Sequence, residues 1–195
     1  MDTKTPVVNI RQGKLLEPFF QAYVKEKYPE HIFLDELGVA EKVSLFKTEW
    51  SLYQKVFFNA IFEVSGLRST RNVIDVFIVS ATDKDMSAPL IIRSRYEPKE
   101  FVNVLMHELL HIILTDNNVT IAFGDESKTT KNHIYVFALL TYLFKEILHD
   151  ERGLELEKKK SDSEKNLEYR RAWDIVEKNG YKEIISTLKI KTPRR

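Results

Sequence analysis

The sequence contains no cysteine. This absence excludes a disulfide framework, a cysteine-based zinc site and a thiol nucleophile. Any metal that the chain binds must therefore be held by histidine, aspartate or glutamate side chains. The chain has 5 histidines and 29 acidic residues from which such a site can be built.

An excess of charge of one sign is also lacking. The 30 basic residues balance the 29 acidic ones, which leaves a net charge of +1. Balanced charge gives no argument for a nucleic-acid partner or for an anionic membrane surface. Apolar residues make up 43% of the 195 residues, which is enough for a proper core in one domain, with or without a helical appendage.

Long apolar runs are the third absence. The first twenty residues contain no apolar run of signal-peptide type. Every apolar run is also far shorter than the roughly 18 residues of a membrane span. We therefore expect a cytoplasmic protein without membrane contact.

Apolar periodicity predicts two helices and then two strands in the first half of the chain. Apolar residues recur every three or four positions over residues 14–28 and about 40–64, and Gly66 ends the second of these helices. Residues 72–80 and 89–94 are rich in Val, Ile and Phe and read as strands, with the polar stretch ATDKDMSA as a loop between them. The two helices could cap the core or dimerise, and periodicity does not separate these alternatives.

The second half of the chain is predicted to be mostly helical. A helix begins at Pro98 and runs to about Thr115, and residues 119–123 form a short strand. Cap candidates in SKTTKN precede a second apolar helix over about 131–149. The charge run 155–165 is typical of a solvated helix face or connector, and two amphipathic helices follow from residue 164.

These elements predict an α+β fold, mostly helical, with a small sheet before the helix that begins near residue 98. Changes of composition suggest three segments. Residues 1–66 are N-terminal helices packed on the core, 67–150 form the core itself, and 151–195 form a C-terminal helical segment. Together they are expected to make one compact unit.

The stretch VNVLMHELLHIILTD is apolar almost all round a helix, yet it carries His107, Glu108 and His111. Burying three ionisable groups is costly unless each is satisfied. Residues four apart share one helix face, so the two imidazoles can bind one metal ion. Glu108 lies about 100° further round the helix, where it can act as general base on a water in an open coordination position. This spacing is the H-E-x-x-H pattern of zinc peptidases.

A catalytic zinc site needs a third protein ligand besides a water molecule. We predict His133, which lies 22 residues after His111 at the start of the next apolar helix. That distance lets the chain turn and return antiparallel to the first helix. The alternative third ligands are carboxylates, namely Glu146, Asp125 and Glu126.

Four further polar residues have weaker assignments. Asp116 ends the helix or forms a hydrogen bond to one of the metal ligands. Asn103 lies one turn before His107 and orients a ligand, meets the substrate or is an ordinary polar helix residue. Of the remaining histidines, His149 is interpreted as structural and His31 as a loop residue.

These residues resemble those of the zincin metallopeptidases. In the gluzincin branch, the H-E-x-x-H helix is followed about twenty residues later by a second helix, whose Asn-Glu pair supplies the third ligand. The corresponding letters here are HELLH and then NH at 132–133. The resemblance implies zinc ligation by His107 and His111 and a base role for Glu108. It places His133 where the family has glutamate, and no metzincin extension follows.

The resemblance covers about residues 72–149 and implies a mode of substrate binding. The edge strand of a zincin sheet binds an extended peptide by adding it to the sheet, and residues 89–94 are the predicted edge. Some minimal gluzincins are held latent by their own C-terminal segment. By analogy, the helices at 164–190 would have that role here.

Three functions compete at this point. The first is a zinc-dependent metalloendopeptidase, in which zinc activates a water molecule and Glu108 moves its proton to hydrolyse a peptide or protein. Tyr135 and Tyr142 are either packing residues or candidates for the oxyanion donor that the reaction needs. The second is a zincin-fold regulatory or binding protein that acts on a single partner. The third is a structural helical module in which the histidine pair is incidental.

Overall fold

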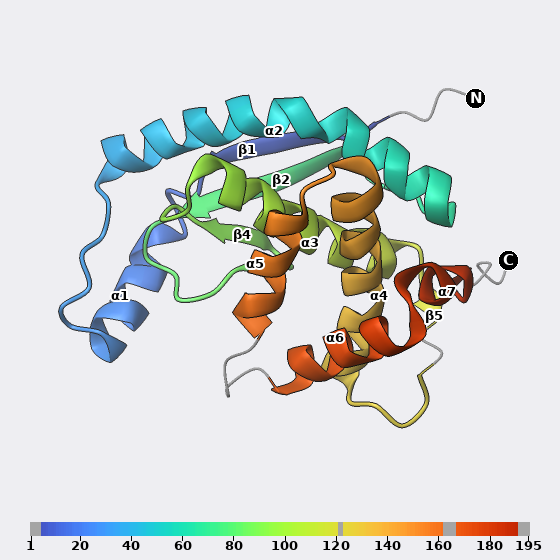
Figure 1. Cartoon of the computed structure of the whole chain (residues 1–195). Coiled ribbons are helices and arrows are strands. Elements are labelled where there is room, and N and C mark those ends of the chain that lie inside the picture. Colours follow the sequence, from blue (N-terminus) through green and yellow to red (C-terminus); the bar gives the residue numbers. More distant parts are fainter. Residues whose placement is uncertain (1–4, 121–122, 162–166, 191–195) are drawn as a thin grey trace, which may run out of the picture. The chain divides into compact units, whose positions relative to one another are not determined.

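Helices dominate the structure, and a small mixed sheet comes before the helix that carries the H-E-x-x-H pattern (Figure 1). The predicted α+β class is therefore confirmed. The computed structural model describes residues 5–120, 123–161 and 167–190. Within these ranges, no helix is both long enough and apolar enough to cross a membrane.

The chain forms two compact units, and two long helices belong partly to each. The first unit comprises residues 1–55 and 71–109, and the second comprises 56–70 and 110–195. The shared helices are α2 (Glu36–Ser65) and α3 (Pro98–Asp116). Because α3 is one continuous helix, the positions of its residues relative to one another follow from helix geometry alone.

The sheet of the first unit has four strands in the order β1-β2-β4-β3. They are β1 (Val7–Gln12), β2 (Val73–Val79), β3 (Met86–Ser87) and β4 (Leu90–Arg93). The first, second and fourth of these run parallel, whereas β3 is antiparallel to β4. The strands predicted at 72–80 and 89–94 are thus confirmed as β2 and β4.

Two features of the sheet differ from the sequence prediction. Strand β1 was not predicted, because its six residues alternate weakly and end on polar side chains; its pairing with β2 extends from Val7 to Gln12. Residues 89–94 are not the sheet edge, because Ile91 pairs with Phe77 on one side and with Met86 on the other. The neighbouring strand β3, hidden in the predicted loop, occupies that edge.

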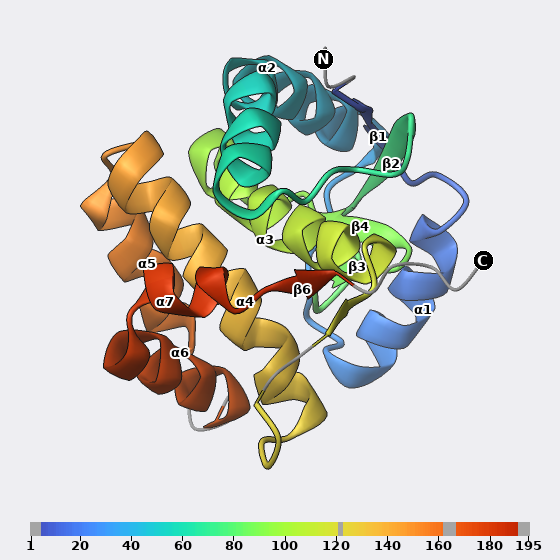
Figure 2. The same ribbon diagram turned by 90° about the vertical axis from the view of Figure 1, so that its right-hand side faces the viewer.

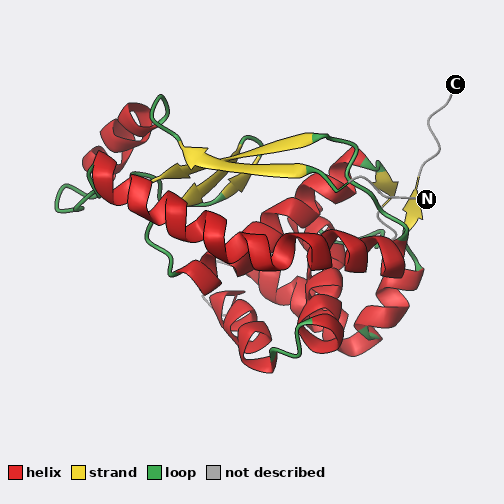
Figure 3. Cartoon of the chain, turned by 90° about the horizontal axis from the view of Figure 1, so that it is seen from above, coloured by secondary structure: helices red, strands yellow, loops and turns green. Residues whose placement is uncertain are grey.

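Helix α1 (Glu17–Lys27) and the first part of α2 belong to the first unit. That part of α2 runs along β1 and β2 (Figures 1 and 3). Its buried positions include Phe46 and Trp50, as the three-to-four residue periodicity predicted. The ring of Phe46 stacks on that of Phe101 at the start of α3, with ring centroids 4.0 Å apart. This contact ties the two helices together within the unit.

The second unit is built around one almost fully buried helix. Its elements are α4 (Lys128–Tyr142), the π-helical turn η1 (Leu143–Ile147), α5 (Glu151–Ser161), α6 (Leu167–Asn179) and α7 (Tyr181–Ser186). Figure 2 shows α6 and α7 beside α4. The rings of Phe137 and Trp173 stack with centroids 4.1 Å apart, which makes α6 part of this core.

The ends of these helices follow the predicted signals with small differences. Ser127 caps α4 by accepting a hydrogen bond from the Thr130 backbone, 3.1 Å away. The helix predicted over 131–149 starts earlier and finishes as a π-helical turn, after which His149 has a φ of 50°. Gly66 and Gly180 have φ values of 70° and 82°, a conformation that glycine adopts at no steric cost.

The short strand predicted at 119–123 is present as β5 (Val119–Thr120), which pairs antiparallel with β6 (Lys189–Ile190). Residues 121–122 lie outside the described residues. The charge run predicted at 155–165 continues α5 as far as Ser161, and its remainder lies outside the described residues as well. Within the described part, its lysines are partly or fully exposed, as expected for a solvated helix face.

Candidate metal centre

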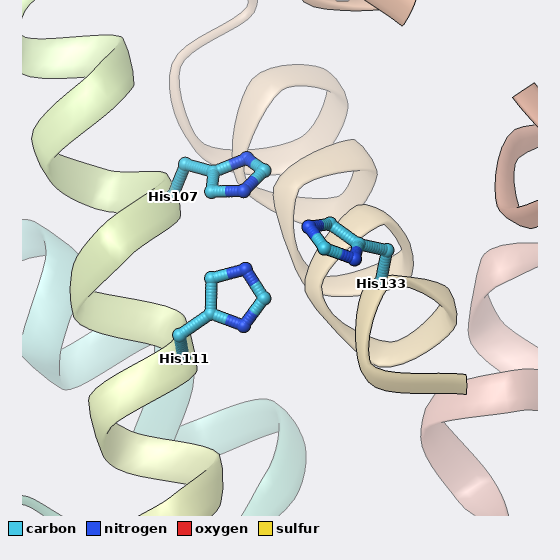
Figure 4. A group of neighbouring side chains, drawn as sticks. All are labelled: His107, His111 and His133. Atoms are coloured by element: carbon cyan, nitrogen blue, oxygen red, sulfur yellow. The ribbon is translucent and has the colours of Figure 1, made fainter. Parts of the chain in front are cut away.

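Helix α3 brings two histidines onto one face. His107 and His111 are four residues apart, so they lie one above the other about 6 Å along the helix axis. Their neighbours on the helix are fully buried apolar side chains, such as Leu105, Met106 and Leu109. This packing fixes the helix and leaves the two imidazoles projecting from one side of it (Figure 4).

The third histidine comes from the start of α4. The ring of His133 meets that of His111 edge-on, with centroids 4.7 Å apart. One nitrogen from each of His107, His111 and His133 lies within 4.8 Å of the others (Figure 4). Three nitrogens on one zinc ion are about 3.3 Å apart, because each Zn–N distance is about 2.0–2.1 Å. The nitrogens would therefore have to move closer together to hold one zinc ion as a three-histidine site.

The tautomer of His133 suits metal binding. Its Nδ1 is 2.8 Å from the backbone carbonyl oxygen of Thr129, so Nδ1 carries the proton and donates it to that oxygen. The lone pair is then on Nε2, which is buried and faces the other histidines. Metal-ligating histidines commonly have such a partner on their second nitrogen, since it fixes both the tautomer and the ring orientation.

Aromatic rings hold the His133 imidazole in place. The Tyr169 ring of α6 has its centroid 3.9 Å from that of His133, and the two planes are inclined at 32°. Phe137, one turn further along α4, has its ring centroid 5.4 Å away. A ring packed between such neighbours loses little further freedom when it binds a metal.

Burial keeps His111 and His133 neutral. Together with the neighbouring His133, burial lowers the pKa of His111 to about 3. The pKa of His133 is also lowered by burial, despite the opposing effect of its hydrogen bond to Thr129. Neutral imidazole is the form that binds zinc, so neither residue needs to lose a proton near pH 7 before binding.

Glu108 lies in a different environment, within the first unit. Burial, together with the negative charge of Asp85, raises the pKa of its carboxyl group to about 8. A hydrogen bond from Ser87 and the positive charge of Arg93 act in the opposite direction. A carboxyl group whose pKa lies near the working pH is suited to general acid–base catalysis.

Asp85 is the centre of a polar network that sequence reasoning missed. Arg93 donates to its carboxylate through Nη2 at 2.5 Å and through the backbone N–H at 3.0 Å. The hydroxyl of Tyr96 donates to the same carboxylate at 2.6 Å and also contacts Arg93. The one available signal was the pair of aspartates in ATDKDMSA, which reads equally well as a polar loop.

The carboxylates proposed as alternative third ligands are engaged elsewhere. Glu146 accepts from Lys182 at 2.8 Å and from the hydroxyl of Tyr181. Glu126 forms an ion pair with Arg171 at 2.7 Å. Within the described ranges, the three histidines are the only group of potential ligands that lie this close together, so it includes neither Asp125 nor these glutamates.

The structure also places the four polar residues that had weaker assignments. Asp116 at the end of α3 accepts a hydrogen bond from Thr70 at 3.2 Å, in keeping with a helix stop. Asn103 is buried, and His31 and His149 are exposed. Neither of these two histidines joins the cluster on α3 and α4.

A small cavity adjoins the cluster in the second unit. Its volume is about 90 Å³, and it is lined by His111, Leu114, Thr115, Val119, Asn132 and Tyr135. The hydroxyl of Tyr135 is 3.2 Å from that of Thr187. Tyr142 lies nine residues along α4 from His133, about 13 Å along the axis, where burial and the negative charges of Glu63 and Glu146 raise its pKa. Of the two tyrosines, only Tyr135 lines this cavity.

The chain matches no family model, and no curated protein or solved structure matches it either.

Proposed function

We propose that this protein is a zinc-dependent metallopeptidase that cleaves peptide or protein substrates. The observation that carries the proposal is the convergence of His107, His111 and His133 beside Glu108. Two of these residues follow from a local helical repeat, whereas the third comes from a different helix. Three neutral or partly buried imidazoles around one point form a typical zinc donor set. The cytoplasmic location expected from the sequence belongs to the same proposal.

The chemistry divides between the metal and Glu108. When bound, zinc supplies a Lewis acid that polarises a carbonyl group and lowers the pKa of water. Glu108 follows His107 directly, so its carboxylate projects beside the metal ligands rather than among them. In its ionised form it takes a proton from the attacking water and passes that proton to the leaving amine nitrogen.

The sheet edge next to Glu108 supports a peptide substrate. Strand β3 (Met86–Ser87) stands at the end of the sheet, and the side chain of Ser87 hydrogen-bonds to Glu108. An extended peptide that adds to β3 would therefore pass the base. Main-chain hydrogen bonds to such an edge give affinity, and side-chain pockets give specificity.

The direct test is Glu108→Gln. This change keeps the size of the side chain but removes its ability to accept a proton, so turnover of casein or a peptide library should fall by roughly 10²–10⁴-fold. Zinc content should remain as in the wild type. Glu100→Gln, an exposed position in the first turn of the same helix, is the matched control and should retain activity.

Two results would overturn the proposal. A wild-type protein that takes up no zinc when zinc is supplied would favour the structural helical module, in which the histidine pair is incidental. Full peptidase activity in Glu108→Gln would exclude its role as base.

The contact between α6 and the cluster favours a second candidate, a regulatory protein that acts on one partner. Tyr169 lies on the ring of His133, so one side of the third ligand is covered by the chain itself. Because α6 is packed into the core through Trp173, this cover is part of the fold. Cleavage of a single protein, with no activity on casein, would distinguish this candidate from a general peptidase.

A further inference from the structure

The outer side of α2 carries a stripe of residues that the core does not use. Positions 41, 45, 48, 52 and 55 recur at intervals of four and three, so they share one face of the helix. This outer stripe consists of Glu41, Leu45, Thr48, Leu52 and Lys55, and all five are exposed. The core residues Phe46 and Trp50 lie on the opposite side of the helix.

Two leucines are the apolar part of the outer stripe. Leu45 is 51% exposed and Leu52 is 68% exposed. They are seven residues apart, or about 10 Å along the axis. A single exposed leucine is ordinary on a protein surface, but leucines two turns apart on one face form the repeat through which helices pair.

The residues between the leucines permit close contact with another helix. Thr48 donates its hydroxyl hydrogen to the Ser44 carbonyl at 3.1 Å, and Ser51 donates to the Thr48 carbonyl at 2.7 Å. Both hydroxyl donors are thus satisfied within α2. Covering these small side chains would leave no donor unpaired.

The charges at the two ends of the stripe determine which partner fits. Glu41 and Lys55 lie seven positions to either side of Thr48. A second α2, antiparallel and related by a two-fold axis near Thr48, places Glu41 opposite Lys55 of the other copy and Leu45 opposite Leu52. We propose that the outer stripe is the contact through which two copies of this chain form a symmetric antiparallel dimer.

The same charges exclude the parallel arrangement. Two parallel copies in register would bring Glu41 against Glu41 and Lys55 against Lys55, and like charges at such positions oppose pairing. In the antiparallel dimer, each charge of the stripe faces its opposite. The orientation therefore follows from residues that the monomer does not need for its core.

Sedimentation equilibrium of the full chain over a concentration series tests the dimer. The contact is one helix wide, so we expect a dissociation constant in roughly the micromolar range. Glu41→Lys and Lys55→Glu should each raise that constant about tenfold or more, because each creates two like-charge pairs in the symmetric dimer. An equimolar mixture of these two variants should associate again, and so should the double variant.

Leu52→Ser should also weaken association, and Leu167→Ser, at a position 66% exposed on α6, is its matched control. Circular dichroism melting of every variant checks that folding is retained. A wild-type chain that stays monomeric up to about 1 mM would overturn the proposal and leave the stripe to a different partner. A dimer that tolerates both single charge reversals would overturn it equally.

Discussion

The histidine cluster and Glu108 are adjacent in the sequence but differ in readiness for chemistry. Burial favours the neutral form of every ionisable group, so it lowers the pKa of His111 to about 3 and raises that of Glu108 to about 8. For a histidine, the neutral form is the one that binds a metal. For a glutamate that acts as a base, the neutral form is the inactive one.

The difference implies an order of events. The cluster can take up a cation at neutral pH without first losing a proton from His111 or His133. A cation bound there favours the ionised form of the nearby Glu108, because opposite charges attract more strongly where water is excluded. In the proposed enzyme, metal binding and activation of the base would thus be coupled by electrostatics, and each part of this comparison can be tested separately.

The largest expected effect is on metal affinity. His133→Ala removes one of the three proposed ligands, so zinc affinity should fall by roughly 10³-fold while the chain stays folded. Competition with a chromophoric chelator measures this change, with His31→Ala as the exposed histidine control. Equal zinc affinity in the wild type and in His133→Ala would mean that a residue other than His133 is the third ligand.

The next effect concerns the base. Asp85 raises the pKa of Glu108, so Asp85→Asn should shift the acidic limb of the kcat/KM profile to lower pH by about one unit. The position of that limb does not depend on how much enzyme is folded. Asp83→Asn is the control, because the side chain of Asp83 pairs with Lys27 instead, at 3.0 Å. If the acidic limb stays at the same pH in Asp85→Asn, the charge of Asp85 does not set the pKa of the catalytic base.

A third effect is on the stability of the metal-free protein. The pKa of His111 is about 3 in the folded chain and 6.5 ordinarily. Between these values the unfolded chain binds a proton that the folded chain does not, so stability falls as the pH falls from 6.5 towards 3. His111 alone would account for a loss of up to roughly 5 kcal/mol, measurable by urea unfolding at several pH values.

Glu108 adds the opposite dependence to the metal-free protein. Its pKa is raised from 4.5 to about 8, so the folded chain keeps a proton that the unfolded chain releases. Stability should therefore fall as the pH rises through that window. Glu108→Gln removes this second slope and leaves the first. If Glu108→Gln leaves the pH dependence of stability unchanged, the raised pKa of Glu108 is contradicted.

The smallest effect concerns the aromatic cover on His133. Tyr169→Ala removes a ring 3.9 Å away and should accelerate zinc release, by less than about tenfold. Tyr169→Phe keeps the ring and should behave like the wild type. Stopped-flow mixing with excess chelator distinguishes them. Faster release in both variants would show that the hydroxyl group, rather than the ring, holds His133.

Much of the fold was accessible from local patterns. Helix α3 was predicted from apolar spacing and from Pro98 in its first turn, and strands β2 and β4 from runs of branched residues. Strand β1 was missed because six residues with Asn9 and Arg11 among them carry little strand signal. What makes it a strand is a parallel partner more than 60 residues away, which no local window contains.

In the candidate site, too, some features follow from local sequence patterns and others depend on contacts between distant segments. The sequence by itself determined that His107 and His111 share a helix face and that Glu108 projects beside them, because a helix repeats every 3.6 residues regardless of its surroundings. For the third position, the sequence proposed His133 but left three carboxylates open, and only the tertiary structure decided that His133 lies with the other two histidines. The tertiary structure alone decided that Asp85, Arg93 and Tyr96 form a network near Glu108 and that β3 is the sheet edge. Those contacts join segments distant in sequence, and they depend on how buried surfaces pack rather than on any local repeat.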